Sequence, residues 1–304
     1  YQVSSYCPVL FYSWYRGLYS LRLLTICDMG AVMSISSPDS GNEYLVKPPA
    51  VAGLFYPDSA QQLRQDVAGY LAESEPREDI APQALIAPHA GYIYSGPVAA
   101  SAYRQLKLLD HPVERVVMLG PAHRVGFQGI AMHSADYFET PLGRVSLDRE
   151  AVKLLTHFPF VNVVDSAFAQ EHSLEVQLPF LQQILGPFKL VPMLVGQSSY
   201  QQVDQVLEHI SAGANDLIVI STDLSHYHHY EQAKEMDIEA GRAIEALEPD
   251  RLQFEHACGR IPVGGLLLYA KRHGLKAITL DQRNSGDTAG SHDQVVGYGA
   301  YAFV

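Results

Sequence analysis

The stretch QALIAPHAGY, residues 83–92, passes directly from an apolar segment into a proline, a histidine and a glycine. Residues 83–87 have the length and apolar character of a buried strand, and Pro88 ends it. Two other segments repeat this arrangement: VVMLGPAH at residues 116–123 and LIVISTDLSH at residues 217–226. Ligands of open α/β sheets bind beyond the carboxyl ends of the strands. If the three strands are parallel neighbours, their histidines should therefore meet at one cleft.

The rest of the chain alternates apolar runs with amphipathic segments, which is typical of a layered α/β protein. The expected strands are residues 83–87, 115–119, 190–195, 216–221, 276–280 and 295–304. The expected helices run from a cap at Ser59 to about residue 71, from a cap at Asp148, and over residues 200–210, 231–247 and 264–273. Residues 45–304 are predicted to form a single three-layer α/β/α domain with a mostly parallel central sheet.

The first 44 residues do not fit this pattern. They show neither a helical nor a strand period, and a tract rich in Ser, Pro and Gly follows Met33. Met29 and Met33 are both candidate starts. We expect residues 1–44 to be an extension outside the fold, either disordered or upstream of the true start.

The composition excludes several classes of protein and partner. Lys and Arg total 21 against 33 Asp and Glu, a net charge of −12, and no basic cluster offsets it, so nucleic acid is not an expected partner. Only Cys258 lies outside the first 44 residues, which rules out a disulfide framework and indicates a cytoplasmic protein. No apolar run reaches the roughly 18 residues of a membrane helix, so no membrane association is expected.

Three residues are candidate metal ligands. His89 and His123 each follow a proline closely at the end of a predicted strand. Cys258 precedes a predicted helix, and the helix dipole and nearby Arg260 would favour its thiolate. Two imidazoles and one thiolate suit zinc, copper or ferrous iron. The alternatives are histidines that bond neighbouring carbonyls and a cysteine that packs as a small apolar residue.

His172, His226 and Asp223 are candidate catalytic residues for acid–base chemistry. Asp223 and His226 could form a carboxylate–imidazole pair in the cleft, or an Asx-type turn with a solvated histidine. Glu171 and Glu175 are four residues apart, which on a helix would point both carboxylates the same way. Glu171 could support a neighbouring histidine, but an acidic first turn that complements the helix dipole is the favoured interpretation. His228 is expected to be solvated.

Seven blocks, in order, resemble the Memo family, whose bacterial and archaeal members are called AmmeMemoRadiSam system protein B. They are PAVAGLFYP (49–57), APHAGY (87–92), GPAH (120–123), TPLG (140–143), EHSLEVQLP (171–179), STDLSH (221–226) and CGR (258–260). The resemblance covers the chain from residue 48 to its end. It implies a fold similar to class III extradiol dioxygenases, which hold ferrous iron through two histidines and a glutamate.

Carried over by motif, the two histidines are His89 and His123, and Asp223 and His226 line the same pocket. Cys258 stands where the dioxygenases have glutamate, which puts ring-opening activity in doubt. The resemblance implies a ferrous-iron-dependent redox protein of unknown substrate, with copper or zinc as alternative metals. It also implies a small-molecule or peptide ligand, with radical-SAM and AMMECR-type proteins as partners. The competing interpretations are a non-catalytic peptide- or protein-binding module and a zinc-dependent hydrolase.

Overall fold

The computed structural model describes residues 44–304 except 78–79, 212 and 214. The expected extension, residues 1–44, therefore lies outside the described residues apart from Tyr44, whose ring packs edge-on against Tyr137 at 5.4 Å. Within the described part of the chain, no helix combines the length and the apolar composition needed to cross a bilayer.

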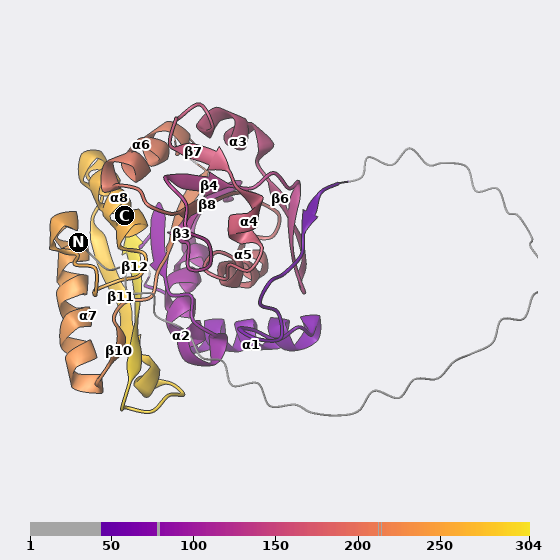
Figure 1. The fold of residues 1–304 in the computed structure, drawn as a ribbon. Coiled ribbons are helices and arrows are strands. Elements are labelled where there is room, and N and C mark those ends of the chain that lie inside the picture. The colour runs from indigo at the N-terminus through magenta and orange to yellow at the C-terminus, as the bar shows by residue number, and fades with distance from the viewer. Residues whose placement is uncertain (1–43, 78–79, 212, 214) are drawn as a thin grey trace, which may run out of the picture. The chain divides into compact units, whose positions relative to one another are not determined.

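A mixed sheet forms the centre of the domain (Figure 1). Along its main path the strand order is β1-β5-β6-β8-β3-β9-β2-β12-β10, and β6, β8, β3, β9 and β2 are parallel to one another. The antiparallel β12 borders β2 and also pairs with β10 and β11. The strands are β1 (Val46–Lys47), β2 (Ala84–Ala87), β3 (Arg115–Pro121), β4 (Ile130–Met132), β5 (Tyr137–Thr140), β6 (Gly143–Leu147), β7 (Val161–Val163), β8 (Lys189–Val195), β9 (Asp216–Ser221), β10 (His226–His228), β11 (Ala277–Asn284) and β12 (Val295–Phe303).

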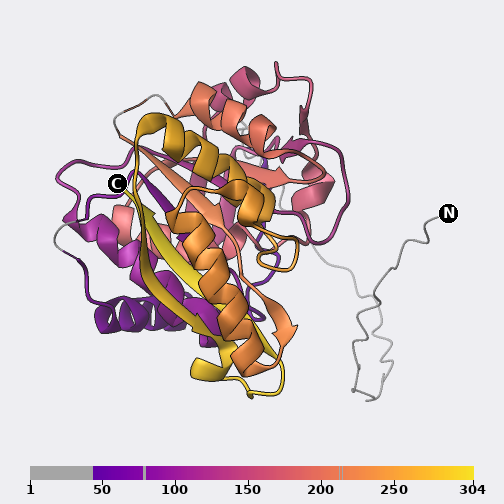
Figure 2. The ribbon, with the colours of Figure 1, turned by 90° about the vertical axis from the view of Figure 1, so that its left-hand side faces the viewer.

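Helices cover both faces of the sheet, as the residue pattern of its strands requires. In β2, Leu85 and Ala87 belong to one apolar core, whereas Ala84 and Ile86 belong to the other. The first core includes side chains of α1, α2 and α5, and the second those of α3, α6, α7 and α8, as the turned view in Figure 2 shows for α7 and α8. The helices are α1 (Ala60–Glu73), α2 (Tyr92–Tyr103), α3 (Arg149–Leu155), α4 (Asp165–Phe168), α5 (Leu178–Leu185), α6 (Tyr200–Ile210), α7 (Tyr230–Glu245) and α8 (Arg260–His273). The predicted three-layer α/β/α domain is confirmed.

Several elements differ from those expected. The strands β1, β4, β5, β6, β7 and β10 and the helices α2 and α4 were not predicted, and β11 continues to Asn284, beyond its expected end at residue 280. The helix α2 was not predicted, because its sequence carries small residues and an internal Pro97 instead of an amphipathic stripe. The helix α8 begins at Arg260, four residues before the expected start. Pro262 is its third residue, a position where the missing N–H leaves no bond unmade. The predicted caps are present, since Ser59 accepts a bond from Gln62 N and Asp148 one from Ala151 N.

Glu175 attaches the N-terminal segment of the domain to its core. Its buried carboxylate lies 3.0 Å from Lys47 Nζ and accepts bonds from the backbone N–H groups of Ala50 and Val51 and from the hydroxyl of Tyr56. Four donors satisfy the buried charge, which would otherwise be strongly unfavourable. This attachment holds residues 50–56 against the sheet, close to the strand ends.

Replacing Glu175 with alanine should lower the free energy of unfolding by about 3–5 kcal/mol, because it leaves the buried Lys47 ammonium without its counter-charge and three other donors without an acceptor. Urea denaturation at pH 7 measures the change. Glu150→Ala is the control, since it removes a carboxylate whose ion pair with Lys153 is exposed and contributes about 0–1 kcal/mol. Equal losses in the two variants would contradict the role given to Glu175.

Candidate metal centre

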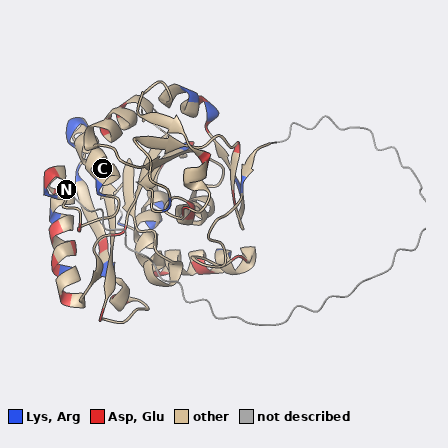
Figure 3. Ribbon diagram, in the orientation of Figure 1, with Lys and Arg blue, Asp and Glu red and all other residues tan. Residues whose placement is uncertain are grey.

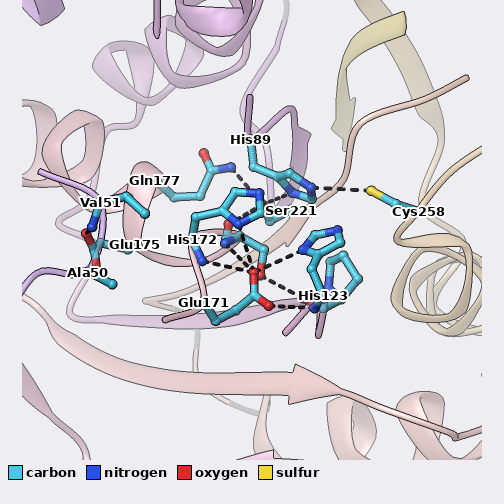
Figure 4. Close-up of polar contacts among 12 residues, drawn as sticks. Ala50, Val51, His89, His123, Glu171, His172, Glu175, Gln177, Ser221 and Cys258 are labelled. Carbon is cyan, nitrogen blue, oxygen red and sulfur yellow. Dashed lines mark hydrogen bonds and ion pairs between the residues drawn. The ribbon is translucent and has the colours of Figure 1, made fainter. Parts of the chain in front are cut away.

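His89, His123 and Cys258 come together at the carboxyl ends of the parallel strands. His89 follows β2 and His123 follows β3, and β9 lies between these two strands. Cys258 lies on the segment before α8, and its Sγ atom is 3.3 Å from His89 Nε2 (Figure 4). One ligand atom from each of the three residues lies within 4.8 Å of the other two. The convergence expected of His89 and His123 is therefore present, whereas His226 belongs to neither group of candidate ligands among the described residues.

The position of Cys258 depends on the close approach of the Gly259 backbone to Thr222. A Cβ atom at Gly259 would lie 2.7 Å from the Thr222 side chain, so only glycine fits there without displacing that residue. The N–H of Gly259 donates to Thr222 Oγ1 at 2.8 Å. The Sγ of Cys258 then lies 3.6 Å from the carbonyl oxygen of Asp223, just beyond the end of β9.

The hydrogen bonds at Ser221 fix the tautomer of His89. The Ser221 hydroxyl donates its one proton to the carbonyl of Ser173 at 2.5 Å, because a carbonyl can only accept. Its oxygen must therefore accept from both Gln177 Nε2, at 2.8 Å, and His89 Nδ1, at 2.9 Å. Tyr103 donates to the other end of the Gln177 amide. The Nδ1 atom of His89 thus carries the ring proton, and the Nε2 lone pair faces Cys258.

Glu171 orients His123 in the same way. Its carboxylate accepts bonds from the backbone N–H and the Nδ1 atom of His123 and from the backbone N–H groups of His172 and Ser173. Because a carboxylate only accepts, His123 Nδ1 bears the proton and Nε2 is left for a ligand. Histidines that bind metals usually donate their second ring N–H to a carboxylate or another acceptor.

The surroundings shift the pKa values of the two imidazoles in opposite directions. Burial, followed by the neighbouring His123 and His172, lowers the pKa of His89 well below 6.5 and keeps its ring neutral. Burial also acts to lower the pKa of His123, but hydrogen bonding to Cys258 and Glu171 outweighs it and raises that pKa to about 10. The side of the centre that holds His123 therefore favours positive charge.

The interpretation of Glu171 as part of an acidic helix turn was wrong. Residues 171–174 are not helical, and α5 begins only at Leu178, next to Pro179. Without a helix, the spacing of four residues does not align Glu171 with Glu175, and the two carboxylates bond different parts of the chain. Glu171 supports His123, the role judged less favourable from the sequence.

His172 lies directly against the candidate ligands. Its ring stacks on His123 at 4.8 Å and packs against Phe55 at 4.6 Å. Its Nδ1 atom lies 3.2 Å from Glu171 Oε1 but without the alignment of a hydrogen bond, and it has no hydrogen-bond partner in the part of the chain described. His123, Glu171 and His172 also form a second group whose ligand atoms lie within 4.8 Å of one another.

Asp223 and His226 lie on the β9 side of the centre. The carboxylate of Asp223 is buried, which raises its pKa, and its Oδ1 accepts from the backbone N–H of His89 at 2.7 Å. Positive charge on His226 would act against that rise. His226 begins β10, and no hydrogen bond joins its ring to Asp223 among the described residues. Asp223 thus positions His89 and does not form the direct pair with His226 that the sequence left open.

In the metal-free protein, His89 should be neutral with its proton on Nδ1 at pH 6.5, where an ordinary histidine is half charged, because burial lowers its pKa and the Ser221 oxygen accepts a hydrogen bond from Nδ1. Long-range ¹H–¹⁵N correlation spectra distinguish the two tautomers. Ser221→Ala removes the acceptor and should populate the Nε2–H form as well. A wild-type ring protonated on Nε2 would refute the assignment.

Comparisons with known proteins relate this chain to one family. The model of the family described as "Memo-like protein" matches residues 47–302. A MEMO1 family protein of Aquifex aeolicus is 39% identical over 264 residues, covering 83% of this chain and 97% of its own. One of Ignicoccus hospitalis is 38% identical, covering 85% and 99%. A crystal structure of an uncharacterized Escherichia coli K12 protein overlaps 72% of this chain and 99% of its own at 12% identity and a TM-score of 0.45, which is too loose to bear on function. The family-model match and the two relatives show that this chain belongs to the Memo family.

Proposed function

We propose that the protein is a metal-dependent redox protein that binds one ferrous ion through His89 Nε2, His123 Nε2 and Cys258 Sγ. One observation carries the proposal. Ser221 and Glu171 accept hydrogen bonds from the Nδ1 atoms of the two histidines, so both Nε2 atoms lie on the side of Cys258, where a metal would replace the second proton that the raised pKa places on His123. Bonds of this kind orient metal-binding imidazoles and make them better donors.

The donor set fits a transition metal. Neutral imidazoles and a thiolate suit ferrous iron, copper and zinc, and the resemblance to the extradiol dioxygenases favours iron. Three protein ligands leave further coordination positions open for a substrate. When bound, a ferrous ion would supply Lewis acidity and one-electron chemistry.

The neighbouring side chains take defined roles in this proposal. His172 moves a proton at its buried Nδ1, which has no hydrogen-bond partner among the described residues. Asp223 holds the backbone of His89, and through it the imidazole, in place. His226 sets the charge next to Asp223.

Zinc-dependent hydrolysis is the second candidate, because the same two imidazoles and one thiolate also suit a catalytic zinc with an open position. In that case zinc, and not iron, would be retained after purification without oxygen. A binding module would need neither metal, so the identity and amount of metal in the analysis below separate the three functions.

Replacing His89 or His123 with alanine should lower the metal content from about one ion per chain to near zero, because each change removes one of three ligands. Metal analysis of anaerobically purified protein measures this. His228→Ala is the control, since it removes a histidine of β10 that belongs to neither group of candidate ligands. Full occupancy in both ligand variants would refute the site.

The iron-loaded protein should not open simple catechols at a useful rate, because Cys258 takes the place of the dioxygenase glutamate and a thiolate donates more charge than a carboxylate. We expect less than about one thousandth of the ordinary enzyme turnover of about 10 s⁻¹. The test is anaerobic iron loading followed by oxygen and a panel of catechols, read as the yellow ring-opened product.

Cys258→Glu restores the dioxygenase ligand set and should give weak ring opening with catechols that enter the pocket. Robust product from the unmodified protein would contradict the argument from Cys258 and would make ring cleavage the leading function.

A further inference from the structure

A cavity of about 820 Å³ adjoins the candidate metal centre. Three segments form its wall: residues 121–128 after β3, residues 195–202 after β8, and residues 254–262 leading into α8. Pro121 and Ala122, which precede His123, belong to this wall, and so does Cys258. The cavity is therefore continuous with the centre and large enough for a small organic molecule.

The charge of the cavity wall differs from that of the protein as a whole. The chain has a net charge of −12, and Figure 3 shows acidic positions spread over several helices. Among the described residues that line the cavity there is no Asp or Glu, and Arg260 is the one charged residue. A small anion would therefore meet an attractive position here that most of the surface lacks.

Most N–H groups of the Arg260 guanidinium have no acceptor among the described residues. Its Nη1 donates to the hydroxyl of Tyr200 at 3.2 Å, and its guanidinium lies 5.7 Å from the ring centre of Phe254. Among the described residues no carboxylate lies within ion-pair distance of it, in contrast to Arg115 and Arg272. A guanidinium has five N–H donors, so most of those of Arg260 can reach a ligand.

Close packing of two helices supports the Arg260 side chain. A Cβ atom at Gly264 of α8 would lie 2.4 Å from the ring of Tyr200 in α6, so the glycine lets that ring pack against the helix. The hydroxyl of Tyr200 then stands within bonding distance of Arg260. On the other side Phe254, whose ring centre lies 5.7 Å from the Arg260 guanidinium, is 81% exposed and offers an apolar surface beside it.

We propose that this cavity binds the carboxylate of a small organic acid, with Arg260 as the residue that recognises it. Phe254 and Ile261 contact the apolar part of the acid. A single cation matches a singly charged carboxylate better than a doubly charged phosphate, and the planar guanidinium can bond both oxygens at once. As a statement about the substrate, this inference rests on the proposed metal centre, two residues away at Cys258.

Titration of the full-length protein with benzoate and with benzamide tests the inference, because the two probes share size and shape but differ in charge. The zinc-loaded and metal-free forms are both titrated, and amide chemical shifts give the dissociation constants. Benzoate should bind at least about 10-fold more tightly than benzamide, as expected of a charge-assisted bond. Arg260→Gln should remove this preference, and Arg260→Lys should keep part of it.

Arg242→Gln is the matched control, since it removes the same charge from an exposed position on α7. It should leave the preference for benzoate unchanged. Equal binding of the two probes, no binding of either, or a preference that persists in both Arg260 variants would overturn the inference. Metal content is measured in the same samples. Selective benzoate binding by protein that retains no zinc after loading would refute the metal centre alone, whereas full zinc content without selectivity would refute the inference alone.

Discussion

Ser221 has one hydroxyl proton, and the carbonyl of Ser173 accepts it. The tautomer of His89 follows from the direction of that bond, because it obliges the serine oxygen to accept from His89 and Gln177. Gln177 in turn accepts from Tyr103 of α2. A buried chain of hydrogen bonds thus runs from the core to the imidazole, and its low-dielectric surroundings make any broken member costly. These bonds connect the imidazole of His89 to the core of the domain and hold it in a fixed position.

The ends of the strands could be predicted from the sequence, because a parallel strand that is buried on both faces has a short, continuous run of apolar residues. From that regularity alone, the sequence predicts that His89 and His123 lie at one edge of the sheet. The partner of His123 could not be found in this way. The spacing of Glu171 and Glu175 has geometric meaning only on a helix, and residues 171–174 are not helical. Likewise, the contact of Gly259 with Thr222 joins positions 37 residues apart, for which no local pattern exists.

The two candidate histidines differ in which charge their surroundings favour. Burial disfavours a proton on His89, whereas Glu171 and Cys258 favour positive charge at His123. One metal cation would satisfy both conditions, because it needs neutral imidazoles as ligands and is itself stabilised by the nearby carboxylate and thiolate. The arrangement is therefore more coherent as a cation site than as a set of independently titrating groups.

The segment before α8 links the two candidate binding features. Cys258 contacts His89 at the strand ends, and Arg260 bonds Tyr200 of α6. Only Gly259 separates them, and its N–H is bonded to Thr222, which fixes its backbone. A ligand bound to Arg260 would consequently hold a defined position relative to Cys258, set by one short stretch of backbone. Orientation of this kind can lower a reaction barrier substantially. In the roles proposed for Cys258 and Arg260, the CGR block of the sequence would combine a metal ligand and a substrate anchor in three residues.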